Sequence, residues 1–93
     1  PMTHTTHNLT PHELVTRLRK IEGQIRGLQR MVEQGDSCTQ VLTQIAAARA
    51  ALAVVGFGLV DCEVHRALHD GEARGFEAAA ADILTAVELL VDR

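Results

Sequence analysis

Apolar residues recur through most of this chain at alternating intervals of three and four, which is the pattern of amphipathic helices. Three signals precede the first such stretch: Thr10 as an N-cap hydroxyl, Pro11 at the first helical position and Glu13 in the capping-box place. The apolar positions of this predicted helix are Leu14, Leu18, Ile21, Ile25, Leu28 and Val32. Gly35 is expected to end the helix, and Ser37 to cap the next one.

The second apolar stripe is unusually long. Its apolar members are Cys38, Val41, Ile45, Ala48, Leu52, Val55, Leu59 and Cys62, and Arg66 and His69 continue the same spacing. A continuous helix from Ser37 to about His69 would be roughly 50 Å long, at about 1.5 Å per residue. The rest of a 93-residue chain is too small to cover it. We therefore expect a second, antiparallel copy that crosses near Ala50, where the small side chains of AAARAALA (46–53) allow close approach.

A third, short helix is predicted after Asp70 and Gly71, which we expect to break the chain. Its apolar positions are Phe76, Ala80, Ile83, Val87 and Leu90, and this stripe suits a lid on the bundle. No segment alternates with the period of two that marks a strand. The sequence therefore predicts an all-α fold: a three-helix protomer with a long central helix, assembled at least as an antiparallel dimer. We divide the chain into a flexible arm at 1–12 and one helical domain at 13–93.

Composition narrows the class of protein. With 93 residues, 46% of them hydrophobic and 23% charged, the chain suits one small folded domain and is too short for a multi-domain enzyme. Charged residues or glycines interrupt every apolar run before eighteen residues, so we expect no transmembrane helix. There is no basic-then-apolar leader at the start, and we expect a cytoplasmic protein.

The net charge of −3 hides an asymmetry. Residues 13–30 carry five cations and two acids, whereas residues 66–93 carry three cations and six acids. The five cations are Arg17, Arg19, Lys20, Arg26 and Arg30. A solvated helix face is the usual explanation of such a cluster. The alternative is a face presented to a polyanion, which would bind phosphates in a salt-sensitive way.

The two cysteines are the main candidates for chemistry. On one continuous helix Cys38 and Cys62 would lie about 36 Å apart, too far for a disulfide within a protomer. Antiparallel pairing about Ala50 would instead place Cys38 of one chain opposite position 62 of the other. Within DCEVHRALH, Cys62 and His65 share a helix face with Glu63 beside them. Thiolate, imidazole and carboxylate together suit Zn, Cu, Ni or Co.

Simpler interpretations of these residues remain open. Both cysteines fit small core positions, and the histidines fit solvated polar positions. The arm adds His4, His7 and His12, which either fold over a metal or belong to a plain polar tail. There is no nucleophile elbow, no phosphate-binding glycine loop and no paired-carboxylate arrangement, so we do not expect an enzyme.

Two segments resemble a known family. RLRKIEGQIRGLQRMVEQGDSC (17–38), followed by VLTQIAAARAAL (41–52), is similar to the CsoR/RcnR/FrmR family of bacterial repressors, and the likeness extends over roughly residues 13–69. It implies a three-helix protomer, a disk-shaped dimer-of-dimers tetramer, and operator DNA that is released when an effector reaches Cys38. It also implies a set of DNA-binding residues: Arg17, Arg19 and Lys20, with Arg30 and Arg49 as plausible additions.

Departures from the family pattern bear on the effector. Copper sensors of the family carry His and Cys at the places of Glu63 and Ala67, and nickel or cobalt sensors carry His at both, together with an amino-terminal His. Persulfide sensors place their second cysteine five residues beyond Cys62. Formaldehyde sensors use an amino-terminal proline amine and the first cysteine, a pair that Pro1 and Cys38 match.

Three hypotheses follow. The first is a repressor controlled by a transition metal at an inter-subunit site with Cys38. The candidate residues of this site are Cys38, Cys62, Glu63, His65, His4, His7 and Pro1. The second is the same repressor sensing formaldehyde or a reactive sulfur species through Cys38, with Pro1 or Cys62. The third is a helical assembly protein that does not bind DNA.

Overall fold

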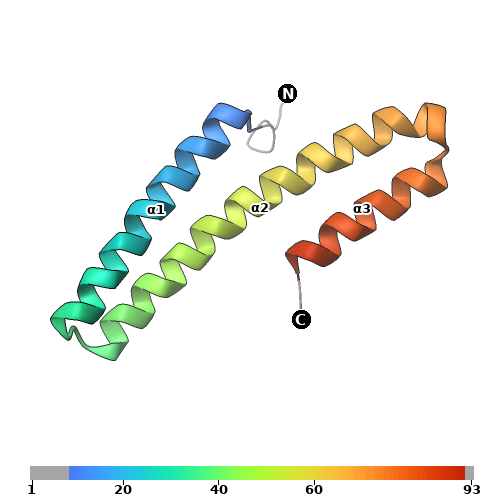
Figure 1. The fold of residues 1–93 in the computed structure, drawn as a ribbon. Helices are drawn as coiled ribbons and strands as arrows, with labels where there is room; N and C mark the ends of the chain where they lie inside the picture. The colour runs from blue at the N-terminus through green and yellow to red at the C-terminus, as the bar shows by residue number, and fades with distance from the viewer. Residues whose placement is uncertain (1–8, 92–93) are drawn as a thin grey trace, which may run out of the picture. The chain divides into compact units, whose positions relative to one another are not determined.

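Three helices account for nearly all of residues 9–91, the part of the chain that the computed structural model describes. They are α1 (Pro11–Gln34), α2 (Cys38–Arg74) and α3 (Phe76–Leu90), shown in Figure 1. Residues 9–91 contain no strand. The prediction of an all-α, three-helix protomer with a long central helix is confirmed. The helices fall into two compact parts, which we call the α1 unit (Thr10–Val55) and the α3 unit (56–91).

The ends of α1 are fixed by local hydrogen bonds, as predicted. The Glu13 amide donates to Thr10 Oγ1 at 3.1 Å, and the Thr10 amide donates to Glu13 Oε1 at 2.8 Å. This reciprocal capping box satisfies two amides that have no partner inside the helix. At the other end Gly35 takes a left-handed φ of 77°, and its amide donates to the Val32 carbonyl at 3.2 Å. Ser37 Oγ then accepts from the Gln40 amide at 3.2 Å and caps α2.

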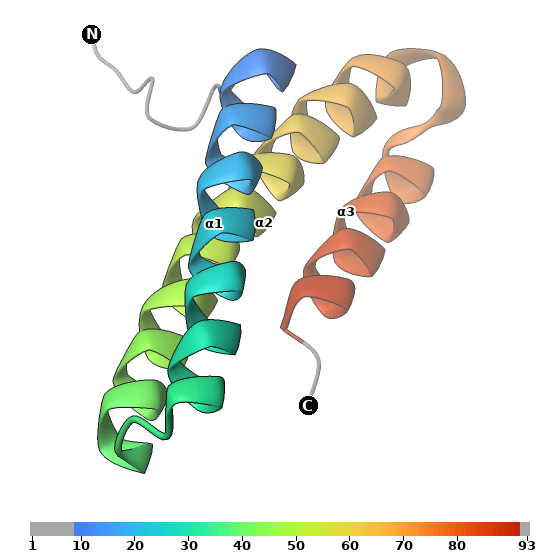
Figure 2. The ribbon, with the colours of Figure 1, turned by 60° about the vertical axis from the view of Figure 1, so that its left-hand side comes forward.

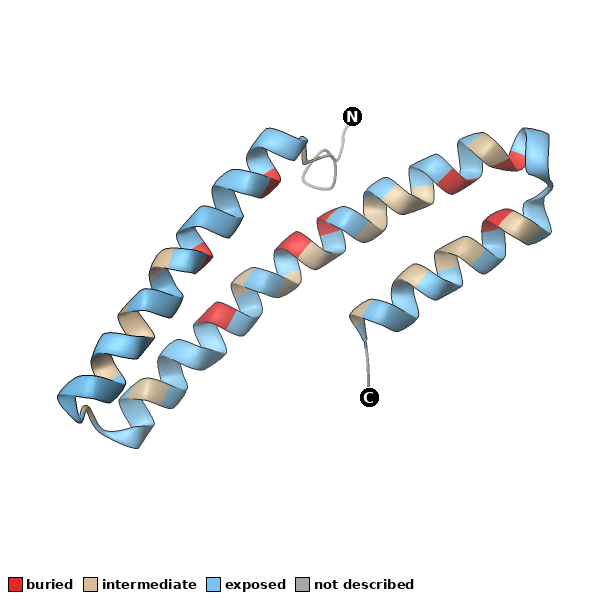
Figure 3. Ribbon diagram, in the orientation of Figure 1, coloured by how far each residue is buried: buried red, intermediate tan, exposed pale blue. Residues whose placement is uncertain are grey.

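The α1 unit has a thin core. Figures 1 and 2 both show α1 running beside the first half of α2. Leu14 and Ile21 of α1 and Ala48 and Val55 of α2 are its buried apolar residues, drawn red in Figure 3. The other large side chains of the α1 stripe are much more exposed, up to 65% for Val32. The predicted stripe is therefore only partly covered by its own chain.

The α3 unit packs through small residues. The second half of α2 contributes buried Ala67 and Gly71, and α3 contributes buried Ala79. A Cβ on Gly71 would lie 3.3 Å from the Ala79 Cβ, and one on Gly56 would lie 2.5 Å from Leu90 Cδ1. Hydrogen side chains at these two positions therefore permit the close approach of α3 to α2 within this unit.

The predicted break at Asp70 and Gly71 is wrong. Both residues lie inside α2, which continues to Arg74. Gly71 is needed for packing against α3 and not for a turn, because its backbone is helical and its face is buried. The chain turns at Gly75, whose φ of 98° and ψ of 149° belong to a region that is essentially restricted to glycine.

Long apolar side chains remain exposed on α2. Leu42 is 62% exposed, Phe57 58% and Leu59 55%. By length and composition α2 could cross a membrane, since one window of 18 residues has a mean hydropathy of 1.8. The expectation of no transmembrane helix rested on the lack of an unbroken apolar run, whereas an average over the window tolerates a single charge such as Arg49. A match by length and composition alone does not overturn that expectation. A core helix of a soluble protein passes the same test.

We predict that Gly75→Ala lowers the free energy of unfolding by about 1–3 kcal/mol, because alanine is strained at this φ and ψ. Gly23→Ala is the matched control in the interior of α1. Its new Cβ would meet only Arg26 Nη2, at 3.9 Å, among the described neighbours. The control should gain about 1 kcal/mol of helix propensity. Urea unfolding followed by circular dichroism, at one protomer concentration, measures both; equal stability of Gly75→Ala and the wild type would contradict the assignment of the turn.

Candidate functional site

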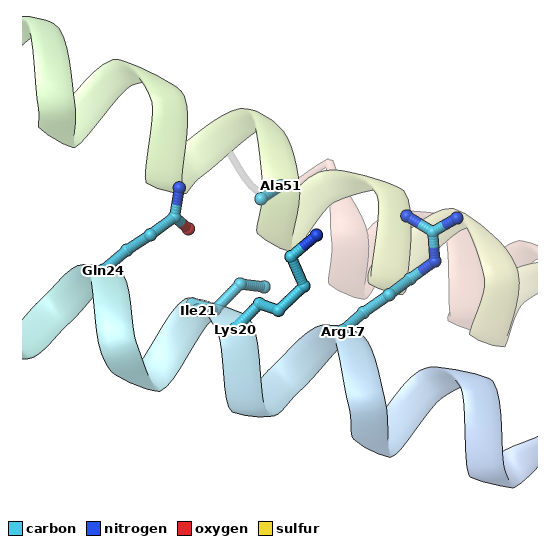
Figure 4. A pocket seen from close by; sticks show the side chains of 5 residues that line it. All are labelled: Arg17, Lys20, Ile21, Gln24 and Ala51. Atoms are coloured by element: carbon cyan, nitrogen blue, oxygen red, sulfur yellow. The ribbon is translucent and has the colours of Figure 1, made fainter.

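The cationic residues of α1 are exposed, and two of them border a hollow. Arg17, Lys20, Ile21 and Gln24 of α1 and Ala51 of α2 line this space of about 240 Å³, shown in Figure 4. The stems of Arg17 and Lys20 rise from consecutive turns on the same side of α1, next to α2. We call this feature the cationic hollow.

A second hollow continues along α1. It has a volume of about 300 Å³ and includes Gln24, Arg30 and Gln34 of α1 with Gln44 of α2. Amides and guanidinium groups are donors suited to phosphate oxygens and base edges. The structure thus brings Arg17 and Lys20 together and puts Arg30 at the neighbouring hollow. Arg19 and Arg49 are exposed but line neither space.

No cation of this surface is neutralised by a close acid within residues 9–91. The ion pairs in that range involve only His65, Arg66 and Arg74 as bases. Exposed cations without a close ion pair remain available to attract a polyanion. The overall charge of −3 is therefore a poor guide to what the α1 unit can bind.

Cys38 is exposed at the first turn of α2. It lies in a largely apolar hollow of about 300 Å³, together with Val32, Asp36, Val41 and Leu42. An exposed thiol at this position is accessible to a metal or an electrophile. Cys38 and the cationic hollow belong to the same compact unit, joined by the short link 35–37.

The second group of candidates lies in the α3 unit. Cys62 and His65 are exposed on α2, and His65 Nε2 is 3.6 Å from Asp61 Oδ2. That carboxylate oxygen is buried and accepts no hydrogen bond from any described residue. A metal-binding histidine often donates its other ring N–H to a carboxylate, which fixes the ring and its tautomer, and Asp61 lies close enough to His65 to be considered for that role. Asp61 was missed as a candidate, although its spacing of i, i+4 to His65 could have indicated it.

Glu63 is held by a different partner. Arg66 Nε donates to Glu63 Oε1 at 2.9 Å and Arg66 Nη2 to Oε2 at 2.6 Å. The same guanidinium donates to Asp70 Oδ2 at 2.8 Å and to Asp82 Oδ2 on α3 at 3.0 Å. Arg74 Nη1 also donates to Asp82 Oδ2, at 2.9 Å. We call these five residues the Arg66 network.

The network perturbs its carboxyl groups. Hydrogen bonds from Arg66 lower the pKa of Glu63, and hydrogen bonds from Arg74 and then Arg66 lower the pKa of Asp82. Both acids stay charged to a lower pH than usual, so the link between α2 and α3 within the unit persists in mild acid.

The structure does not bring the predicted metal ligands together in one protomer. Among residues 9–91, no three side chains of His, Cys, Asp and Glu form a group that could hold an ion. Pro1, His4 and His7 lie outside the described residues. The donors that are accessible, Cys38, Cys62 and His65, offer sulfur and nitrogen, which fit soft and borderline transition metals. A metal would need donors supplied jointly by more than one of these places.

Comparison with known proteins decides the family. The model of the family described as "Metal-sensitive transcriptional repressor" matches residues 11–91. The chain belongs to this family. Its members are transcriptional regulators, which agrees with the expectation drawn from the two segments at 17–38 and 41–52.

Individual relatives of the family are similar over most of the chain. The copper-sensing transcriptional repressor RicR of Mycobacterium tuberculosis (strain ATCC 25618 / H37Rv) is 41% identical over 80 residues, covering 81% of each protein. The copper-sensing transcriptional repressor CsoR of Bacillus subtilis (strain 168) is 37% identical over 73 residues, which cover 77% of this chain and 72% of that protein. The solved structure of the nickel-responsive transcriptional regulator InrS matches with a TM-score of 0.84 and 32% identity, over 97% of this chain and 100% of that one.

Acid should weaken the α3 unit through the network. The folded pKa of Asp82 lies below its unfolded value of about 3.9. Its contribution to stability is therefore complete above that value and is lost as pH falls through the folded pKa. We predict that Asp82→Asn flattens the decline in the free energy of unfolding below about pH 4. Asp36→Asn, outside the network, is the control; identical pH profiles for the wild type and Asp82→Asn would refute the role of the network.

Proposed function

We propose that this protein is a transcriptional repressor that binds operator DNA through the cationic hollow and releases it when a transition metal binds at Cys38. The observation that carries the proposal is the presence of an exposed thiol and an unpaired cationic surface in the same compact unit. Repression fits the family to which the chain belongs, and copper and nickel are the metals to which its named relatives respond. Since a repressor acts where the DNA is, we expect a cytoplasmic location.

DNA binding would be electrostatic and directed mainly to the backbone. Arg17 and Lys20 are the first candidates to contact phosphates, because both line the cationic hollow, and Arg30 extends the surface along α1. Arg19 and Arg49 are exposed and would add to the field of the unit. No Phe, Tyr or Trp lies in the α1 unit, so this proposal assigns no role to base stacking on these side chains.

The effector site would form between chains. Cys38 alone supplies one donor, and we propose that Cys62 and His65 of a second copy complete the set, with the arm adding His4 or His7. Exposed apolar side chains on α2 support an antiparallel dimer of this helix, and a dimer of dimers would follow the family resemblance. A metal bound by Cys38 and by donors of the second chain would link the two chains.

Release of DNA would follow from the position of Cys38 on α2. Its first turn follows α1 directly, after the short link 35–37. The buried apolar core between the helices consists of Leu14, Ile21, Ala48 and Val55 among the described residues. A pull on Cys38 would shift α2 against α1 and change the separation of cations around the hollow. A coupling of about 1–3 kcal/mol would lower DNA affinity by roughly 5- to 150-fold.

We predict that replacing Arg17 and Lys20 by Gln weakens binding to duplex DNA selected from a random library. Each lost phosphate contact should also lower the slope of log affinity against log salt by about 1. Fluorescence anisotropy at several salt concentrations measures both effects. Arg74→Gln is the matched control for each single variant, Arg17→Gln and Lys20→Gln, since it also removes one positive charge, in its case from an ion pair in the α3 unit. An unchanged salt slope in the double variant would instead favour the assembly protein that binds no DNA.

We predict that Cys38→Ala leaves DNA affinity unchanged but abolishes its response to metal. Purified protein on the selected duplex is titrated anaerobically with Zn(II), Co(II), Ni(II) and Cu(I), and Cys62→Ala should weaken the response. If no metal releases the wild type, the metal proposal fails. Release by formaldehyde or polysulfide, with a methylene or sulfur link visible in the intact mass, would then assign Cys38 to an electrophile sensor.

A further inference from the structure

The Arg66 network has no part in the proposed DNA-binding surface, but it contains Glu63, which follows the candidate ligand Cys62 directly. The Arg66 guanidinium grips both oxygens of this carboxylate, at 2.9 and 2.6 Å. The Glu63 side chain is only 29% exposed. Glu63 is the one residue of the predicted ligand set that offers a carboxylate oxygen, and its carboxylate is already paired with the Arg66 guanidinium.

The grip is reinforced from other sides. Arg66 also donates to Asp70 at 2.8 Å and to Asp82 at 3.0 Å. These contacts anchor the Arg66 guanidinium. Glu63 would therefore have to break its hydrogen bonds to Arg66 before its carboxylate could bind another partner. A metal that recruits Glu63 must compete with a fixed positive charge for the same oxygens.

We propose that Arg66 is a specificity-determining residue that selects the metal by keeping Glu63 out of the ligand set, an inference that rests on the proposed metal site at Cys38. With Glu63 held, the accessible donors are the sulfur atoms of Cys38 and Cys62 and a nitrogen of His65. Such a set favours soft ions such as Cu(I). Freeing the carboxylate adds a hard oxygen donor, which improves binding of Co(II) and Ni(II) far more than binding of Cu(I).

The expected size of the effect is modest. Exposed ion pairs stabilise weakly and bidentate ones somewhat more, and Arg66 is 46% exposed. We therefore expect Arg66→Gln to tighten Co(II) binding by about three- to tenfold. The affinity for Cu(I) should stay within about twofold, because soft ions gain little from a carboxylate.

The test compares Arg66→Gln with Arg74→Gln in the full-length chain. Both variants lose one arginine contact to Asp82, but only the first frees Glu63. Co(II) is titrated while its thiolate charge-transfer and ligand-field absorption bands are recorded, and Cu(I) affinity is measured by competition with a chromophoric chelator. Arg74→Gln should match the wild type. The double variant Glu63→Gln/Arg66→Gln should lose the gain in Co(II) affinity and return to the wild-type spectrum.

Arg66→Lys is a second variant that keeps the charge but cannot grip both oxygens, and it should give an intermediate Co(II) affinity. Circular dichroism verifies that each variant is folded. If the wild type binds Co(II) and Cu(I) but Arg66→Gln has wild-type affinities, the selector role is wrong while the metal site stands. Equal gains in Co(II) affinity for Arg66→Gln and Arg74→Gln would also overturn the proposal. The shared cause would then be the lost contact to Asp82 on α3 and not the release of Glu63. If the wild type binds neither metal, the proposed function fails, and the selector role with it.

Discussion

A helix of 37 residues carries more apolar surface than a chain of this size can cover, and the other features of the molecule depend on that shortage. Only six apolar residues in the described range are buried, and three of them are alanines. Leucines and a phenylalanine along α2 stay exposed as a result. The second copy that we propose would bury them, which links the fold to the proposed assembly and places the proposed effector site at the same contact.

The features that the sequence predicted well are those fixed by short-range hydrogen bonds. Thr10 and Glu13 form their capping box whatever lies nearby, and Gly35 and Ser37 likewise end and start helices through bonds to residues three or four positions away. The position of the second break was mispredicted because glycine has two uses. Gly71 admits a neighbouring helix and Gly75 admits a positive φ, and only tertiary packing distinguishes them.

The candidate sites were predictable to different degrees. The exposure of Arg17 and Lys20 followed from their places outside the apolar stripe of α1. Cys38 instead stands in the apolar stripe of α2, and it is exposed because its own chain does not cover the stripe there. The capture of Glu63 did not, because the guanidinium that holds it is also anchored by Asp82, sixteen residues beyond Arg66 on another helix. Pattern analysis treats a carboxylate next to a cysteine as an available ligand. Whether it is available depends on whether a neighbouring cation already binds it in the folded structure.

The thin core of the α1 unit has a consequence for any measurement of operator affinity. In the proposed assembly, a protomer that buries so little of its own apolar surface would gain stability by mass action from its partners, so dilution would remove folding free energy as well as neighbours. At the low protein concentrations used to titrate tight DNA complexes, the observed midpoint would then contain the free energy of assembly. Two repressors with identical DNA contacts but different α2 surfaces would then differ in apparent DNA affinity. They would also differ in the number of protein copies needed to repress a promoter.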